Sequence, residues 1–244
     1  MPRSSACRQS WVIAILLCWI FQPQIAAANP EAHCERYPPH TELSTPFTLV
    51  SWNIEKGADS AWPEVLKSIP DGVSLVLLQE AYQPYGLIHL GFDHAHQWFA
   101  PGYLAKTQQT GVLTAARATA LRHCRLQALE PWLGTPKAVS VTDFNLHNRD
   151  QTLRVINVHA VNFELGAEAL EAQLAALEPF ISEHQGPLVL AGDFNTWSAA
   201  RGAVLMSLVD RGRLTAVTLD PDHRTTALGF PLDHILRRPQ RAVS

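Results

Sequence analysis

The amino-acid sequence predicts one domain of mixed strands and helices, of the α/β or α+β class. Short apolar runs alternate with stretches of helical period, and several of the runs end in an acid or an amide. The clearest run, Leu188–Ala191, stops at Gly192-Asp193-Phe194-Asn195. The 244 residues are 47% hydrophobic and 17% charged, which is enough to bury one sizeable core. Because α/β folds assemble polar sites at strand ends, the pattern also predicts an enzyme.

Residues 1–28 have the features of a cleaved secretory signal. Arg3 and Arg8 precede an apolar stretch over 11–21, and three alanines then supply the small residues that cleavage needs, so Asn29 is the expected mature start. The apolar stretch is shorter than the ~20 residues that cross a bilayer. We therefore expect a periplasmic or secreted protein with no stable membrane span after the signal is removed.

Charge and cysteine content limit the function classes. Removal of Arg3 and Arg8 changes the formal charge from -3 to -5, which argues against tight nonspecific binding to duplex DNA. Cys34 and Cys124 are the cysteines that follow the signal. An oxidising compartment favours a disulfide between them, but sequence does not supply the geometry, so a disulfide and two free thiols both stay open.

The strands are expected within a domain that spans 47–244. Residues 29–46 hold four prolines and no periodicity, which predicts an extended lead-in. Residues 81–110 are rich in aromatic residues, histidine and glycine, and predict a surface region that borders the site. The expected strands are, in order, 47–53, 73–79, 112–114, 138–142, 153–159, 188–191 and 232–236.

Three helices are expected between these strands. The first covers about 60–69, with a serine at its N-cap and an acid in its first turn. The second covers 163–184, where apolar residues repeat at spacings of three and four and Asn162 can cap the start. The third covers 199–211 and is closed by Gly212.

The candidate site combines hard oxygen donors with one imidazole. Such a set suits Mg²⁺ or Mn²⁺ rather than structural zinc, because Mg²⁺ prefers a few carboxylates and several waters. A metal ion beside an acid that orients water and an imidazole that binds a phosphoryl oxygen is suited to phosphate-ester hydrolysis. The six residues are Asn53, Glu80, His159, Asp193, Asn195 and Asp233.

Five motifs, in order over residues 47–236, resemble those of the endonuclease/exonuclease/phosphatase superfamily. They are Ser51-Trp52-Asn53-Ile54, Leu78-Gln79-Glu80, Asn157-Val158-His159, Gly192-Asp193-Phe194-Asn195-Thr196 and Leu232-Asp233-His234-Ile235. Residues 110–113, 130–138 and 157–166 are similar to its YafD-like branch in particular. The resemblance implies a two-sheet sandwich flanked by helices, in four αββα layers, with the site at the strand ends.

The resemblance also implies a role for each site residue. Glu80 would bind the metal ion, and Asn53 would help to hold it. Asp193 would orient or deprotonate the attacking water. Asn195 and His159 would bind and polarise the scissile phosphate.

Asp233 in this superfamily orients a histidine from a later Ser-Asp-His motif, which residues 235–244 do not contain. We therefore expect the last strand to be missing, as in a shortened or frameshifted product or a branch with impaired chemistry. His234 is a poor substitute because its side chain should point to the opposite face of the strand from Asp233. His223 is freer, but we do not expect it to replace the histidine.

Two functions follow from the resemblance. The first is a Mg²⁺-dependent hydrolase of phosphate esters, of phosphodiesterase, nuclease or phosphatase type. The second is a catalytically impaired member that keeps metal or phosphate-ligand binding. The sequence does not choose among nucleic acid, lipid phosphate and small esters as substrate, and it leaves the oligomeric state open.

Overall fold

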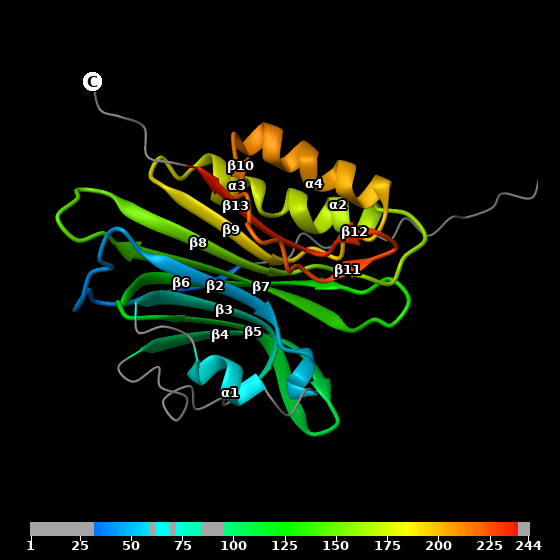
Figure 1. The fold of residues 1–244 in the computed structure, drawn as a ribbon, viewed down its shortest axis with the longest axis horizontal. Helices are drawn as coiled ribbons and strands as arrows, with labels where there is room; N and C mark the ends of the chain where they lie inside the picture. Colours follow the sequence, from blue (N-terminus) through cyan, green and yellow to red (C-terminus); the bar gives the residue numbers. More distant parts are fainter. Residues whose placement is uncertain (1–31, 59–61, 69–71, 84–94, 239–244) are drawn as a thin grey trace, which may run out of the picture.

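Two β-sheets packed face to face form the centre of the protein, and helices lie outside them (Figure 1). The computed structural model describes residues 32–58, 62–68, 72–83 and 95–238. The larger sheet has the order β1 (His33–Arg36), β6 (Ala120–Leu129), β7 (Pro136–Asn145), β8 (Thr152–His159), β9 (Leu188–Asp193), β13 (Asp233–Arg238) and β10 (Thr215–Ala216). The smaller sheet has the order β2 (Thr48–Asn53), β3 (Val73–Tyr82), β5 (Gln108–Ala116) and β4 (His96–Ala105). This arrangement confirms the predicted fold class.

Short elements complete the chain. The hairpin of β11 (Thr226–Ala227) and β12 (Phe230–Pro231) precedes β13. The helices are η1 (Glu55–Gly57), α1 (Trp62–Lys67), α2 (Glu168–Ala175), α3 (Glu178–Ser182) and α4 (Ala199–Gly212). Helices α2, α3 and α4 cover the larger sheet, and α1 lies beside the smaller one (Figure 1). Within the described residues, no helix combines the length and apolar character needed to cross a bilayer.

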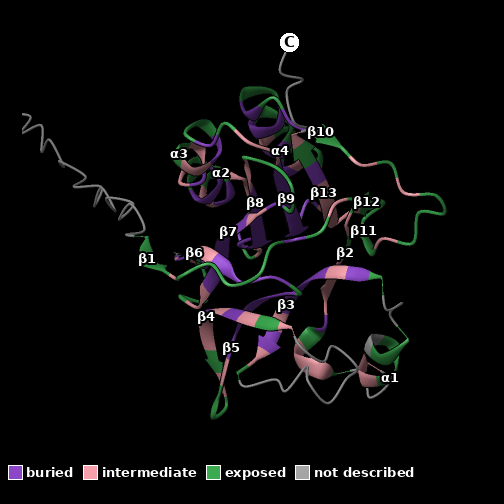
Figure 2. Cartoon of the chain, turned by 90° about the vertical axis from the view of Figure 1, so that its left-hand side faces the viewer, coloured by how far each residue is buried: buried purple, intermediate pink, exposed green. Residues whose placement is uncertain are grey.

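The middle strands of the larger sheet are buried on both faces, as the purple β7, β8 and β9 in Figure 2 show. Along β8, Val155 packs into the cluster between the two sheets, and Ile156 packs into the cluster beneath the helices. Leu75 and Leu77 of β3 meet the first cluster. Because the strand ends of both sheets are held by these clusters, polar residues that follow the strands have fixed positions.

Several predicted elements differ from the structure. Strands β4 and β6 were not expected, and the single helix over 163–184 is two helices, α2 and α3. Asn162 does not cap α2; the Glu164 carboxylate instead accepts the backbone N–H groups of Ala169 and Leu170. Gly212 is the last residue of α4, and Arg213 takes the left-handed conformation after it. The serine predicted to start the first helix lies outside the described residues.

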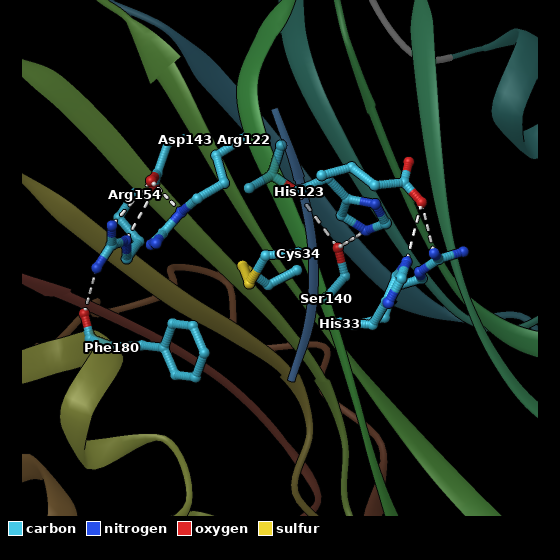
Figure 3. The surroundings of a disulfide bond; sticks show 12 residues. His33, Cys34, Arg122, His123, Ser140, Asp143, Arg154 and Phe180 are labelled. Atoms are coloured by element: carbon cyan, nitrogen blue, oxygen red, sulfur yellow. Dashed lines mark hydrogen bonds and ion pairs between the residues drawn. A yellow bond between two sulfur atoms is a disulfide. The ribbon is translucent and has the colours of Figure 1, made fainter. Parts of the chain in front are cut away.

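A disulfide joins Cys34 and Cys124, which resolves the choice that the sequence left open. The two residues face each other across β1 and β6, so the lead-in contributes an edge strand that is covalently tied to the larger sheet. Figure 3 shows the pair near the carboxylate of Asp143, which accepts hydrogen bonds from Arg122 and Arg154.

Candidate active site

Asp193 is the last residue of β9 and lies at the centre of the site. Gly192 precedes it with φ 140°, and a Cβ atom there would lie 2.0 Å from the carbonyl oxygen of Val158, so β9 can approach β8 this closely only with glycine. Asn53 Nδ2 donates to Asp193 Oδ2 at 2.9 Å, and the Asn195 backbone N–H donates to Oδ1 at 2.9 Å. Burial raises the pKa of Asp193. The carboxylate is therefore held from two sides and favours its protonated form more than a solvated acid does.

Asn195 lies beyond the strand, in the left-handed conformation with φ 50°. Its side-chain Nδ2 donates to the carbonyl oxygen of Ala160 at 2.9 Å. Asn195 therefore does not continue the strand, and alternation of side chains along β9 does not explain why it lies next to Asp193. A tight turn brings them together instead, and it links the segments that follow β8 and β9.

Glu80 lies where the register of β3 against β5 shifts, between Leu78 and Ala81. Its backbone takes the left-handed conformation there, with φ 53°. The Glu80 carboxylate forms an ion pair with Lys56 from η1. Its Oε1 atom lies 3.9 Å from Lys137 Nζ and 3.5 Å from His159 Nε2. Glu80 thus faces two ammonium groups and an imidazole that come from three other segments.

Lys137, at the start of β7, contacts the imidazole directly: its Nζ atom lies 2.9 Å from His159 Nε2 and 3.5 Å from Glu130 Oε1. Burial, and then the charges of Lys137 and Lys56, hold the pKa of His159 well below its usual value. Because an ammonium group can only donate, Nε2 of His159 accepts, and the neutral ring carries its proton on Nδ1. The positive charge next to this imidazole is that of Lys137.

Asp233 lies opposite Asp193 across β9 and β13. Burial, and then the charge of Asp193, raise the pKa of Asp233 to about 7, although Arg224 acts in the other direction. The Arg224 guanidinium binds the Asp222 carboxylate and donates to the backbone oxygen of Asp233 at 3.1 Å. A cavity of about 450 Å³ opens here, and its polar lining includes Asn53, Asp193, Asp220, His223, Arg224 and Asp233.

His234 makes contacts away from this cavity. Its Nε2 atom lies 2.7 Å from Thr196 Oγ1, and its ring meets Phe194 edge-on with centroids 5.8 Å apart. These contacts agree with the prediction that His234 faces away from Asp233. His223, the alternative weighed from the sequence, lines the cavity on the exposed loop before Arg224.

All six sequence-predicted residues gather at one end of the two sheets. Strand pairing aligns His159, Asp193 and Asp233 across β8, β9 and β13, while Asn53 and Glu80 come from the smaller sheet. The sequence reasoning missed four charged residues of this site, which are Lys56, Glu130, Lys137 and Arg224. A signal existed for Lys137, because its charged side chain directly precedes the apolar residues Ala138 and Val139 near the start of β7.

The donor set fits a divalent cation that keeps much of its water. Among the described residues, no group of three or more His, Cys, Asp and Glu could hold a metal ion. Mg²⁺ does not need one, because it binds through one or two carboxylates and retains several waters. Glu80 supplies one carboxylate, which pairs with the Lys56 ammonium in this structure. Asn53 Oδ1 accepts the Glu55 N–H at 3.0 Å and keeps a second lone pair.

Comparison with known proteins places the chain in a family. Residues 50–244 match the model of the Endonuclease/Exonuclease/phosphatase family. The chain belongs to this family. A UPF0294 protein of Vibrio parahaemolyticus is 36% identical over 202 residues, which cover 79% of this chain and 69% of the relative. The more specific likeness to the YafD-like branch stays a prediction.

Solved structures share the fold at low identity. The human Nocturnin catalytic domain with bound sulfate matches with TM-score 0.59 and 16% identity, over 85% of this chain and 84% of that one. The 3′ phosphatase NExo from Neisseria, bound to a product DNA hairpin, matches with TM-score 0.54 and 21% identity, over 78% of this chain and 86% of that one. Members of the family are metal-dependent phosphoesterases.

Proposed function

We propose that this protein is a Mg²⁺-dependent hydrolase of phosphate esters that is exported to the periplasm or secreted. The observation that carries the proposal is the doubly anchored carboxylate of Asp193, which lies between Asn53 and the Asn195 backbone and next to Asp233 in an open cavity. An acid fixed in this way can orient a water molecule and accept its proton. Family membership supports phosphate esters as the substrate class.

The residues divide the work by charge. Asp193 takes the proton of the attacking water, helped by a pKa that burial raises. Lys137, held against His159, offers a fixed positive charge to a phosphoryl oxygen. Glu80 and Asn53 would hold the metal ion, which when bound supplies charge neutralisation for the phosphate. Asn195 links Asp193 to the segment that follows His159, because its backbone N–H donates to Asp193 and its side chain donates to the Ala160 carbonyl oxygen.

The impaired member is the second candidate, and one observation favours it. Two ammonium groups, those of Lys56 and Lys137, already balance the charge of Glu80. A carboxylate whose charge is compensated attracts a divalent cation less strongly. In this case the protein would keep phosphate-ligand binding through the same lysines and lose turnover.

Hydrolysis of two soluble esters separates the candidates. Bis-p-nitrophenyl phosphate reports diesterase activity and p-nitrophenyl phosphate reports monoesterase activity, each measured with Mg²⁺ and with EDTA. We expect Mg²⁺-dependent turnover that disappears in Asp193→Ala, while Asp210→Ala, which removes an exposed acid on α4 outside the cavity lining, keeps it. A folded wild-type chain with no turnover of either ester would favour the impaired member.

Export is tested separately. We expect protein expressed from residues 1–244 to appear outside the cytoplasm with Asn29 as its first residue, as N-terminal mass spectrometry can show. Protein that keeps residues 1–28 and stays in the cytoplasm would contradict this part of the proposal.

A further inference from the structure

Exposed apolar side chains gather at the end of the molecule that carries the site. Of the ten large hydrophobic residues that are exposed in the described part of the chain, eight lie in or beside four loops at one end of the molecule. The other two, Val65 and Met206, lie on α1 and α4. We call the eight the apolar rim; they are Leu104, Leu129, Trp132, Leu133, Phe163, Leu165, Leu228 and Phe230.

Strand pairing puts these four loops at the same end as the catalytic candidates. The β4–β5 turn adjoins the end of β3, because Tyr82 pairs with Thr110. The β6–β7 loop and residues 161–167 lie at the end of β8, beside His159. The β11–β12 hairpin leads into Leu232, whose carbonyl oxygen accepts the Phe194 N–H at 2.9 Å. All four loops lie at the right-hand side of the molecule in Figure 1.

The acidic side chains of the four loops are buried. Glu130 and Glu164 are the acidic residues of the four loops, and they are 1% and 7% exposed. Glu130 accepts the backbone N–H groups of Asn162 and Phe163 at 2.8 to 3.0 Å. Glu164 pairs with the fully buried Arg201 at 2.6 Å. These bonds hold the loops in place while their apolar side chains point to solvent.

Within the four loops the exposed charge is positive, and the exposed acid Glu168 begins α2 directly after residues 161–167. Lys106, at the tip of the β4–β5 turn, is their exposed charged residue. Trp132 directly precedes the exposed Leu133, and Phe163 lies two residues before Leu165, which is 91% exposed. Rings and aliphatic side chains around a cation are what an anionic lipid surface accepts at its headgroup boundary.

We propose that the apolar rim is a lipid-binding surface that seats the open cavity on an anionic phospholipid bilayer. Four separate loop tips can meet one broad surface together, whereas a bound peptide needs a continuous groove. A site seated in this way would take phosphate esters of membrane lipids as its substrate class. The statement about substrate rests on the proposed function; the statement about binding does not.

Co-sedimentation with vesicles tests binding without any need for turnover. We expect the protein to sediment with vesicles of phosphatidylcholine mixed with phosphatidylglycerol, and less with phosphatidylcholine alone. The double variants Trp132→Ser/Leu133→Ser and Phe163→Ser/Leu165→Ser should each bind roughly tenfold more weakly, because each removes two inserted apolar side chains. Lys106→Glu should weaken binding to the mixed vesicles alone.

Met206→Ser is the matched control, because Met206 is 53% exposed on α4 and outside the rim. It should bind vesicles as the wild type does, and circular dichroism melts should show that every variant is folded. Absence of vesicle binding by the wild type, or equal loss in Met206→Ser, would overturn the proposal. Loop variants that change the oligomeric state in sedimentation velocity, without vesicle binding, would show instead that the rim joins two copies of the chain.

Soluble-ester hydrolysis separates this proposal from the proposed function. The rim variants should hydrolyse bis-p-nitrophenyl phosphate at the wild-type rate and lose release of phosphate or headgroup from vesicles. Vesicle binding without hydrolysis of any ester would overturn the proposed function and leave the lipid surface standing. Hydrolysis of the soluble ester without vesicle binding would overturn the lipid-binding surface and support the proposed function.

Discussion

The site has two halves with different charge patterns. The cationic half contains Lys56, Glu80, Glu130, Lys137 and His159. The carboxylate half contains Asn53, Asp193 and Asp233. In the first, two ammonium groups balance two carboxylates around a neutral imidazole. In the second, two carboxylates face each other, and the nearby guanidinium of Arg224 is already bound to Asp222.

This difference assigns different tasks to the halves. A balanced cluster with fixed ammonium groups can take up an anion without a large change in its own structure. Two acids that repel each other retain a proton at higher pH than a single acid does. The carboxylate half is therefore suited to accepting and holding protons, and the cationic half to holding the phosphate.

Among the replacements that compare the two halves, that of Lys137 should have the largest effect. In Lys137→Met the cationic half loses the charge next to His159, and kcat/KM for bis-p-nitrophenyl phosphate should fall roughly 10²- to 10³-fold. Lys137→Arg keeps the charge and should retain more activity. Thermal melts must accompany the kinetics, because Glu130 loses an ion-pair partner. An unchanged kcat/KM in folded Lys137→Met would show that the cationic half does not bind the phosphate.

Replacement of Lys56 should act through the metal ion. Its ammonium pairs with Glu80, so Lys56→Met leaves that carboxylate uncompensated at one oxygen. We expect the Mg²⁺ concentration for half-maximal activity to fall about threefold to tenfold, since one competing cation is gone. Isothermal titration with Mg²⁺ measures the same change without substrate. A higher Mg²⁺ requirement would mean that Lys56 assists the metal ion.

Asp233→Asn should change how stability depends on pH. Between its ordinary pKa of 3.8 and about 7, Asp233 holds a proton in the folded protein that the unfolded chain releases. The folded state thus binds more protons, and the free energy of unfolding should fall as pH rises through this window, by at most about 4 kcal/mol. Urea unfolding in EDTA at several pH values should show this fall in the wild type and a flatter curve in Asp233→Asn. If the free energy of unfolding fell equally with pH in both proteins, the proton bound by the folded state would belong to a group other than Asp233.

The carboxylate half was easier to predict from sequence than the cationic half. Asp193 ends the apolar strand β9 and Asp233 begins β13, and a short sequence motif marks each of them. Lys56 belongs to η1, with a left-handed backbone, and it reaches Glu80 only because β2 and β3 are parallel neighbours. No sequence pattern near Lys56 predicts this contact, because the contact depends on how β2 and β3 pair in the folded protein.

The same limit explains errors in the fold. The helical period over 163–184 was correct in its buried stripe, whose leucines and Ile181 are at most 2% exposed. Its start was wrong because Asn162 instead accepts the Trp197 indole N–H, and Glu164 takes over the first turn of α2. A capping residue can be recognised from sequence only when no distant partner competes for it.

Replacement of His223 should have the smallest effect on activity. It tests whether the carboxylate half needs an imidazole besides Asp193 and Asp233. His223 lines the cavity of the carboxylate half from an exposed loop. If the carboxylate half handles protons through Asp193 and Asp233 themselves, His223→Ala should keep kcat and its pH profile within about twofold of the wild type. A drop of roughly 10²-fold with loss of one limb of the profile would instead make His223 the imidazole that serves Asp233.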